Sequence, residues 1–370
     1  MQIPLLRPDP LDPLPVDTGH YVAALQSQPG ERDALLHLSL DIWERMTPLL
    51  HFVGPKTPPA AFKAQTIRNW VTRLAPSVGE HPMYIDVMRL NPTHPVTVRD
   101  GERAVLECIY DASRSRGLRF VPVMWVGEST DDHRRMVGGA ALQDGHGVAL
   151  RYRMRRYVPP LGTGLEAYLA AELSALGRDA NDADLIVDLE YIDPDDELDP
   201  DGMAAALAQM LAVGPWRSVV ILGTSIPTMM SCVLEGSVGS LTRKEWELWS
   251  QLQQCELDRM PTFGDYAIQN PHPPHDGGGP GMRANIRYTS NGETLVARGR
   301  GPFYEEGNEQ YRGLCEQLVA RTEFAGPDFS WGDGVIDACA AGAVEPGGQR
   351  VWRGAGTSHH LRAVSEQLAS

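Results

Sequence analysis

The sequence predicts a (β/α)8 barrel, and three observations support this fold class. Eight short apolar runs alternate with eight helical patterns along about 300 residues, the number and size typical of such a barrel. The runs are nearly evenly spaced and mostly apolar throughout, as expected for parallel strands that are buried on both faces. No Gly-x-Gly-x-x-Gly turn follows the first run, which disfavours the main alternative, a doubly wound open sheet.

The predicted elements follow one another in strict alternation. The strands are residues 21–27, 47–54, 83–90, 119–127, 147–155, 184–192, 218–227 and 262–268. The helices are residues 30–45, 60–75, 101–117, 131–145, 163–177, 199–214, 241–257 and 305–322. In the first helix, Leu35, Leu38 and Ile42 recur at the spacing that places apolar side chains on one helical face.

Three further segments complete the predicted organisation. Residues 1–20 form a Pro-rich extension before the barrel, which spans residues 21–324. Residues 270–304 are an insertion that holds a β-hairpin turning at Asn291-Gly292. Because the insertion follows the eighth strand, we expect it to rise from the catalytic face as a lid or a partner-binding edge. Residues 325–370 are expected to pack on the barrel as a C-terminal extension.

Composition limits the function classes. The net charge of −15 disfavours nucleic acid and anionic membranes as partners of the whole surface. Five scattered cysteines without a Cys-x-x-Cys pair indicate neither a disulfide framework nor a zinc site. The N-terminus lacks a basic and then apolar leader, and no apolar run has the length of a membrane span. We therefore expect a cytoplasmic protein.

Polar side chains within the predicted strands are the first site candidates, because barrel enzymes work at the carboxyl ends of their strands. They are Asp86, Arg151, Arg153, Asp188, Glu190, Asp265 and Tyr266, the last two expected near the barrel axis. Two interpretations stay open. The arginines pair with acids of the neighbouring strand, which offsets the desolvation of both. Alternatively they grip a phosphate or carboxylate while Asp188, Glu190 or Asp265 acts as a base.

Metal binding is a separate question. Asp86, Asp188, Glu190 and Asp265 carry oxygen ligands suited to magnesium or manganese, so a divalent metal stays open and no metal ligand is assigned. His272 and His275 lack the spacing of a helical zinc pair and fit a mobile, exposed loop better. For the adjacent His359 and His360, we weigh capping of the barrel against entry into its mouth.

Several ordered segments carry a family resemblance. They are GERDALLHL with TPLLHFVG, IVDLEYI, RKEWELW, FGDYAI, IRYT with VARGRG, SWGD and WRGAGTSHHL. Together they resemble the beta-protein family, which is named for a protein of T-even bacteriophages. Its motif residues correspond here to Glu31, Asp188, Asp265, Tyr266, Arg287, Tyr288, Arg298, Trp331, His359 and His360. Members commonly carry lysine and glutamate where this chain has Gln26 and His51.

The resemblance implies a (β/α)8 barrel and a link to phages and bacterial defence, and three hypotheses about function follow. The first is a hydrolase or transferase acting on a phosphate-bearing or nucleotide-like ligand, with Arg151, Arg153 and Arg287 as anion clamps. The residues from the hairpin and tail, Tyr288, Arg298, His359 and His360, are further ligand-binding candidates. The second is a non-catalytic component of a defence or phage module that binds a protein partner. The third is a small-molecule sensor, since a barrel alone does not define a chemistry.

Overall fold

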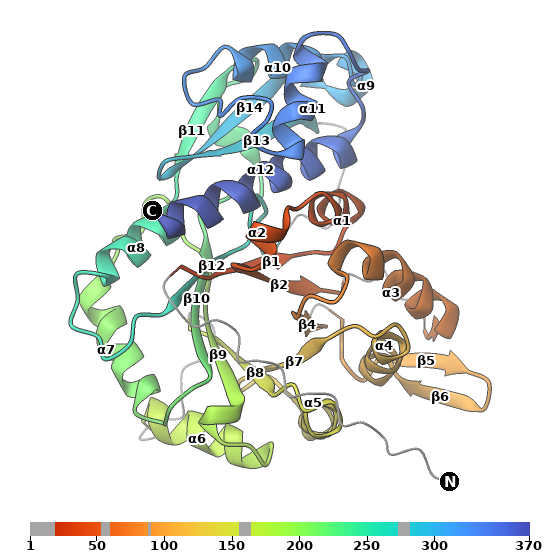
Figure 1. The fold of residues 1–370 in the computed structure, drawn as a ribbon, viewed down its shortest axis with the longest axis vertical. Helices are drawn as coiled ribbons and strands as arrows, with labels where there is room; N and C mark the ends of the chain where they lie inside the picture. The colour runs from red at the N-terminus through yellow and green to blue at the C-terminus, as the bar shows by residue number, and fades with distance from the viewer. Residues whose placement is uncertain (1–18, 53–59, 88–89, 155–163, 273–281) are drawn as a thin grey trace.

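A closed barrel of eight parallel strands forms the centre of the computed structural model (Figure 1). The structure describes residues 19–52, 60–87, 90–154, 164–272 and 282–370. The barrel strands, in chain order, are β1 (Tyr21–Leu25), β2 (Met46–His51), β4 (Met83–Asp86), β7 (Phe120–Trp125), β8 (Val148–Arg153), β9 (Ala183–Tyr191), β10 (Ser218–Thr224) and β12 (Thr262–Asp265). Each falls within or overlaps a predicted strand, and β12 pairs with β1 to close the barrel, so the predicted fold class is confirmed.

Helices cover the outside of this barrel, as the sequence predicts for the first seven units. They are α1 (Pro29–Leu36), α2 (Leu40–Trp43), α3 (Ala64–Val78), α4 (Val105–Arg114), α5 (Asp131–Asp144), α6 (Leu165–Ala175), α7 (Pro200–Leu211) and α8 (Lys244–Leu252). Short 3-10 turns occupy Ala180–Asp182 and Met230–Cys232. Among the described residues, no helix has both the length and the apolar character needed to cross a bilayer.

Two small sheets are added to the barrel. One contains β3 (Phe62–Lys63), β5 (Pro95–Val98) and β6 (Gly101–Ala104), and the sequence analysis did not predict it. The other has the order β11 (Val238–Thr242), β14 (Glu293–Pro302), β13 (Arg283–Ser290), and its β13–β14 hairpin is the predicted one. Gly292 has a φ of 73° at the turn, a conformation that glycine adopts without strain.

The eighth barrel helix comes from the end of the chain. Residues 305–322 were predicted for this position, but they contribute to α9 (Phe303–Glu306) and α10 (Gln310–Val319), and α10 packs on the hairpin sheet. After α11 (Trp331–Ala340), helix α12 (Gln349–Ala369) runs between the hairpin sheet and the barrel and packs on α1 and β1 (Figure 1). Its Leu361 and Val364 join the core between strands and helices.

Small residues allow α12 to lie close to its neighbours. A Cβ at Gly354 would lie 3.0 Å from the carbonyl oxygen of Gly30 in α1. A Cβ at Gly356 would lie 2.7 Å from the carbonyl oxygen of Arg287 in β13. The glycines of the WRGAGTSHHL segment therefore have a packing role, because larger side chains would push α12 away from α1 and from the hairpin sheet.

Alternation along the strands separates two cores. Side chains that point into the barrel include Val22, Leu49, Tyr84, Ile186 and Tyr266, and they form a compact inner cluster. The intervening positions, such as Tyr21 and Phe263, face the surrounding helices. Residues one apart in a strand thus face different environments, which decides where each candidate side chain lies.

Candidate functional site

Arg151 is the centre of a buried polar cluster at the carboxyl ends of the barrel strands. Its guanidinium donates to Asp188 Oδ2 at 2.8 and 3.0 Å and to Asp86 Oδ2 at 2.5 Å. Tyr266 Oη lies 2.5 Å from Nη2, and the His51 ring nitrogen Nε2 lies 2.6 Å from Nη1. Strands β2, β4, β8 and β9, with the residue after β12, thus place five polar side chains together inside the barrel.

The charges of this cluster stabilise one another. Burial alone would lower the pKa of Arg151, but attraction to Asp188 and Asp86 opposes it, and that pKa lies above its usual value. Burial, together with the nearby Asp188, raises the pKa of Tyr266 well above its usual value, although Arg151 opposes the rise. Tyr266 is therefore a neutral hydroxyl that donates to both Asp188 oxygens at 2.8 Å.

A second polar layer lies at the rim of the barrel. Arg153 donates through Nε to Glu128 at 2.6 Å, and its Nη1 lies 3.4 Å from Glu190. The Trp125 ring separates the layers, since the Arg153 and Arg151 guanidinium carbons lie 4.2 and 4.5 Å from its centre. His272 Nε2 lies 2.7 Å from Glu190 Oε1, and the His272 side chain is 46% exposed. The cross-strand ion pairs of the sequence analysis are thus present in both layers.

Backbone strain collects at this end of the barrel. Within the described chain, three residues other than glycine have positive φ angles: Ser27 at 50°, Glu190 at 56° and Ala267 at 50°. All three follow or end a barrel strand, and Glu190 lies beside an irregularity in the β9–β10 pairing. The Asp188 carboxylate accepts the Glu190 backbone N–H at 2.9 Å and so holds this turn. Non-glycine residues in this conformation cluster at functional sites.

Asp265 does not share the Arg151 cluster, contrary to its predicted place near the barrel axis. Its neighbour Tyr266 points inward, so Asp265 points outward toward α12 by strand alternation. There it contacts Tyr21 Oη, lies 3.0 Å from His360 Nε2, and lies 3.4 Å from Arg243 Nη2. Although burial opposes it, the hydrogen bonds from His360 and Tyr21 and the charge of Arg243 keep the pKa of Asp265 below its usual value. Asp265 therefore joins α12 to the barrel.

The tail histidines lie outside the barrel mouth. His359 Nδ1 lies 2.9 Å from Asp333 Oδ2, and its ring stacks on Tyr288 at 3.6 Å between ring centres. Tyr288 also donates to Asp333 at 2.8 Å. His360 binds Asp265, and burial lowers the pKa of its imidazole, so it is neutral. Of the two interpretations of this pair, capping of the barrel is the one that the structure supports.

The remaining predicted residues are scattered. Arg298, in the central strand β14 of the hairpin sheet, donates to the Val233 carbonyl and lies 3.6 Å from Glu235. Arg287 contacts the Ile268 carbonyl and faces a separate cavity beyond the end of β12. Glu31 is fully buried in α1, where its carboxylate accepts the Gln28 N–H at 2.9 Å. Of the three arginines expected to bind an anion together, Arg151 and Arg153 lie at the barrel mouth, whereas Arg287 lies at the separate cavity.

Sequence reasoning missed several members of both clusters. Trp125 donates to both Asp86 oxygens, at 2.9 and 3.0 Å, and Glu128 binds Arg153. Both lie at or just after the end of the fourth barrel strand. Their position could have identified them, because residues at the carboxyl end of a strand face the mouth of any such barrel. Tyr21 and Arg243, which hold Asp265, carry no comparable signal. Within the described part of the chain, no group of three or more His, Cys, Asp or Glu side chains is arranged to hold a metal ion.

The fold and the Arg151 cluster define a TIM-barrel protein with charged side chains at the carboxyl ends of its strands. A family model described as Beta protein matches residues 21–366. The chain belongs to the beta-protein family, as its motifs suggested.

Comparison with solved structures gives distant matches. The HMG-CoA lyase from Brucella melitensis is 16% identical, with 66% of this chain and 80% of the lyase covered and a TM-score of 0.33. A mandelate racemase/muconate lactonizing protein from Herpetosiphon aurantiacus is 9% identical, with 76% of this chain and 63% of that protein covered and a TM-score of 0.34. No curated protein sequence matches the chain.

Proposed function

We propose that this beta-protein family member is an enzyme of phage and host conflict that acts by proton transfer at the barrel mouth. The reaction class is hydrolysis or group transfer on a small phosphate-bearing or nucleotide-like ligand. The observation that carries this proposal is the pair formed by Glu190 and His272, with 2.7 Å between carboxylate and imidazole at the barrel rim. A carboxylate that orients a solvent-accessible imidazole is a common arrangement for general acid and base catalysis.

The chemistry of the pair follows from its hydrogen bond. A carboxylate only accepts hydrogen bonds, so His272 Nε2 carries the proton that is donated to Glu190. The position of Glu190 in a strained backbone conformation fits a residue that is held for function.

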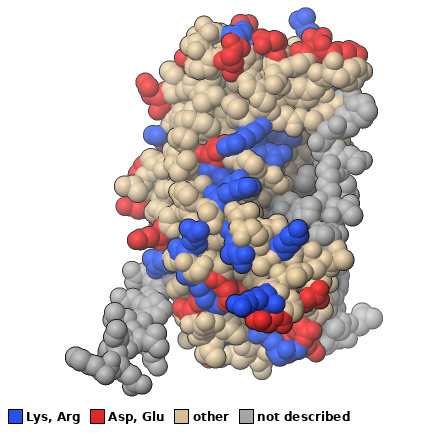
Figure 2. Space-filling model, turned by 90° about the vertical axis from the view of Figure 1, so that its right-hand side faces the viewer, with Lys and Arg blue, Asp and Glu red and all other residues tan. Residues whose placement is uncertain are grey.

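Ligand charge would be met at the same rim. Arg153 is 10% exposed through its side chain, whereas its partner Glu128 is 26% exposed. Glu128 is therefore the carboxylate that an incoming phosphate would displace, and Arg153 would change partners without leaving the Trp125 ring. Figure 2 shows Lys and Arg gathered along the middle of one face, with acidic residues toward its top, bottom and left edge. Positive charge is therefore concentrated locally on this face despite the net charge of −15.

The test combines ligand screening with turnover. Purified wild-type protein would be mixed with nucleotides and phosphorylated metabolites, with and without Mg²⁺, and followed by thermal shift and mass spectrometry. His272→Gln and Glu190→Gln should abolish product formation. His81→Gln is the matched control, because His81 stacks on Trp43 just before β4, at the opposite end of the barrel.

The outcomes separate the three classes of function. Turnover that is lost in both rim variants and kept in the control supports the enzyme. Stabilisation by a ligand without any product would contradict the enzyme proposal and indicate a small-molecule sensor. If no ligand has an effect and a protein partner is captured through the hairpin sheet, the result would indicate a non-catalytic component of a defence or phage module.

A further inference from the structure

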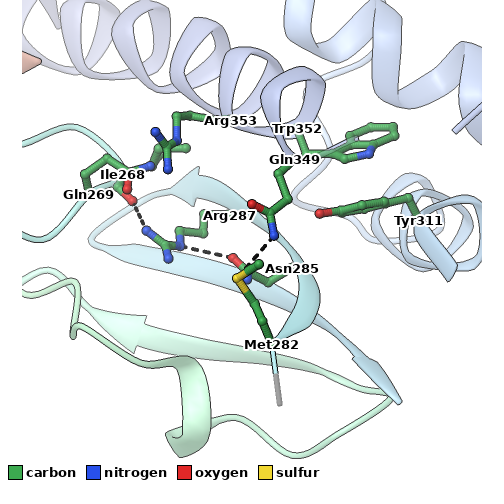
Figure 3. A pocket seen from close by; sticks show the side chains of 9 residues that line it. All are labelled: Ile268, Gln269, Met282, Asn285, Arg287, Tyr311, Gln349, Trp352 and Arg353. Carbon is green, nitrogen blue, oxygen red and sulfur yellow. Dashed lines mark hydrogen bonds between the residues drawn. The ribbon is translucent and has the colours of Figure 1, made fainter. Parts of the chain in front are cut away.

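A cavity of about 120 Å³ lies between β13, the first turns of α12 and the chain just after β12 (Figure 3). Its volume is well above the roughly 10–15 Å³ that one water molecule needs. The polar side chains of its wall come from Gln269, Asn285, Arg287, Tyr311, Gln349 and Arg353. No Asp or Glu is among the lining residues that the structure describes.

Two arginines face this cavity, and neither has an acidic partner among the residues that the structure describes. Arg287 donates through Nε to Asn285 Oδ1 at 3.2 Å and through Nη1 to the Ile268 carbonyl, which are both neutral acceptors. Neither Arg287 nor Arg353 forms an ion pair with an acid of the described chain. Figure 3 shows both guanidinium groups at the same side of the cavity, beside Ile268 and Gln269. Most buried arginines of this protein are instead paired, as Arg151 is with two carboxylates.

The unpaired charges act on each other. Burial and the neighbouring charge of Arg353 lower the pKa of Arg287 to about 10. The indole N–H of Trp352, which also lines the cavity, is buried without a hydrogen-bond acceptor in the described residues. Uncompensated donors and like charges that line one pocket raise the free energy of the folded state, and a bound anion would offset this cost.

We propose that this cavity is a phosphate-binding site in which Arg287 and Arg353 hold the anion. Two guanidinium groups match the charge of a phosphate dianion, and their forked donors suit its tetrahedral oxygens better than a single point charge would. The start of the 21-residue helix α12, at Gln349, adds a favourable dipole. The site uses none of the residues of the Glu190–His272 pair, and it does not depend on the chemistry proposed for that pair.

Binding of inorganic phosphate, AMP and acetate by the full chain would be measured by isothermal titration calorimetry. Arg287→Gln and Arg353→Gln should weaken phosphate binding about tenfold or more, since each removes charged donors. Arg350→Gln is the matched control, because it removes the same charge from the same helix. The Arg350 side chain is 64% exposed and paired with Asp33, so its replacement should leave phosphate binding unchanged.

A second measurement distinguishes a binding role from a structural one. In the absence of phosphate, Arg353→Gln should unfold at the same temperature as wild type or higher, because it removes a repulsion from Arg287. A lower unfolding temperature with unchanged phosphate affinity would show that Arg353 is structural and would overturn the proposal.

The three ligands define what the site accepts. Tighter binding of AMP than of inorganic phosphate would assign the cavity to the phosphate end of a larger molecule, and the reverse would assign it to free phosphate. If the chain bound acetate as tightly as phosphate, the proposal of a specific phosphate site would be overturned. The same conclusion would follow if Arg350→Gln weakened phosphate binding as much as Arg287→Gln and Arg353→Gln do. Calorimetric binding does not require turnover, so failure here is distinguishable from failure of the proposed enzyme.

Discussion

Replacing Arg151 with methionine tests whether one arginine neutralises the two buried acids of the barrel mouth. Arg151 is 1% exposed, and Asp86 and Asp188 are fully buried, so neither acid gains water when the guanidinium is removed. Asp86 keeps the Trp125 N–H, while Asp188 keeps Tyr266 Oη. Breaking a buried ion pair by removing one partner costs about 3–5 kcal/mol. We expect a loss of that size, a large fraction of the roughly 5–15 kcal/mol that stabilises most proteins.

The assay is urea unfolding monitored by tryptophan fluorescence, which is informative because Trp125 contacts Arg151. Arg135→Met is the control, since its side chain is 77% exposed and its pairing with Asp132 should contribute at most about 1 kcal/mol. Adding Asp188→Asn to Arg151→Met should restore part of the lost stability, because one of the uncompensated charges is then absent. A loss below 1 kcal/mol, equal to that of the control, would refute the idea that Arg151 holds this charge balance.

Three further predictions concern pH, packing and helix propensity. Burial lowers the pKa of His133 from 6.5 to about 4, so the unfolded chain takes up its proton first as the pH falls. His133 alone should therefore lower the free energy of unfolding by about 3 kcal/mol between pH 6.5 and pH 4. The His133→Leu protein should lack this contribution and lose less stability over the same pH range. Unfolding curves that show equal acid sensitivity in both proteins would contradict this. Gly332→Ala should cost about 1–3 kcal/mol in the same unfolding assay, because its Cβ would overlap the Ala355 carbonyl oxygen. The exposed helical Gly139 has open space around it, and Gly139→Ala should stabilise the protein by about 0.5–1 kcal/mol.

The barrel was predictable from sequence because parallel strands that are buried on both faces leave short apolar runs at regular spacing. The pairing of Arg151 with the sixth strand was predictable from a different regularity. Side chains alternate along a strand, and this alternation places Arg151 beside Asp188 of the neighbouring strand. Asp265 was misplaced because the prediction put it at the barrel axis together with Tyr266, which alternation forbids for adjacent residues. In TFGD, the large Phe263 faces the helices and Gly264 faces inward, and this contrast gives the correct orientation.

The eighth helix was not predictable from apolar periodicity. Helix α12 is contacted by α1, α11, β1 and β13, so it has no single apolar face. Its buried surface includes Ser358, His359 and His360, whose hydrogen-bond partners come from distant parts of the chain. A hydrogen-bonded interface of this kind leaves no periodic signal, because each polar residue is explained only by the acceptor or donor opposite it.

The late position of α12 affects how the protein is made on the ribosome. The surface over β1 and β12 that this helix covers is complete in sequence once Asp265 has been added, yet roughly a hundred further residues precede the end of α12. At about 5–20 residues per second, this part of the barrel stays uncovered for on the order of 5–20 s in each round of translation. During that interval the nascent chain leaves uncovered side chains such as Tyr21, which contacts His360 of α12, and a chaperone that binds apolar surfaces has time to act on it.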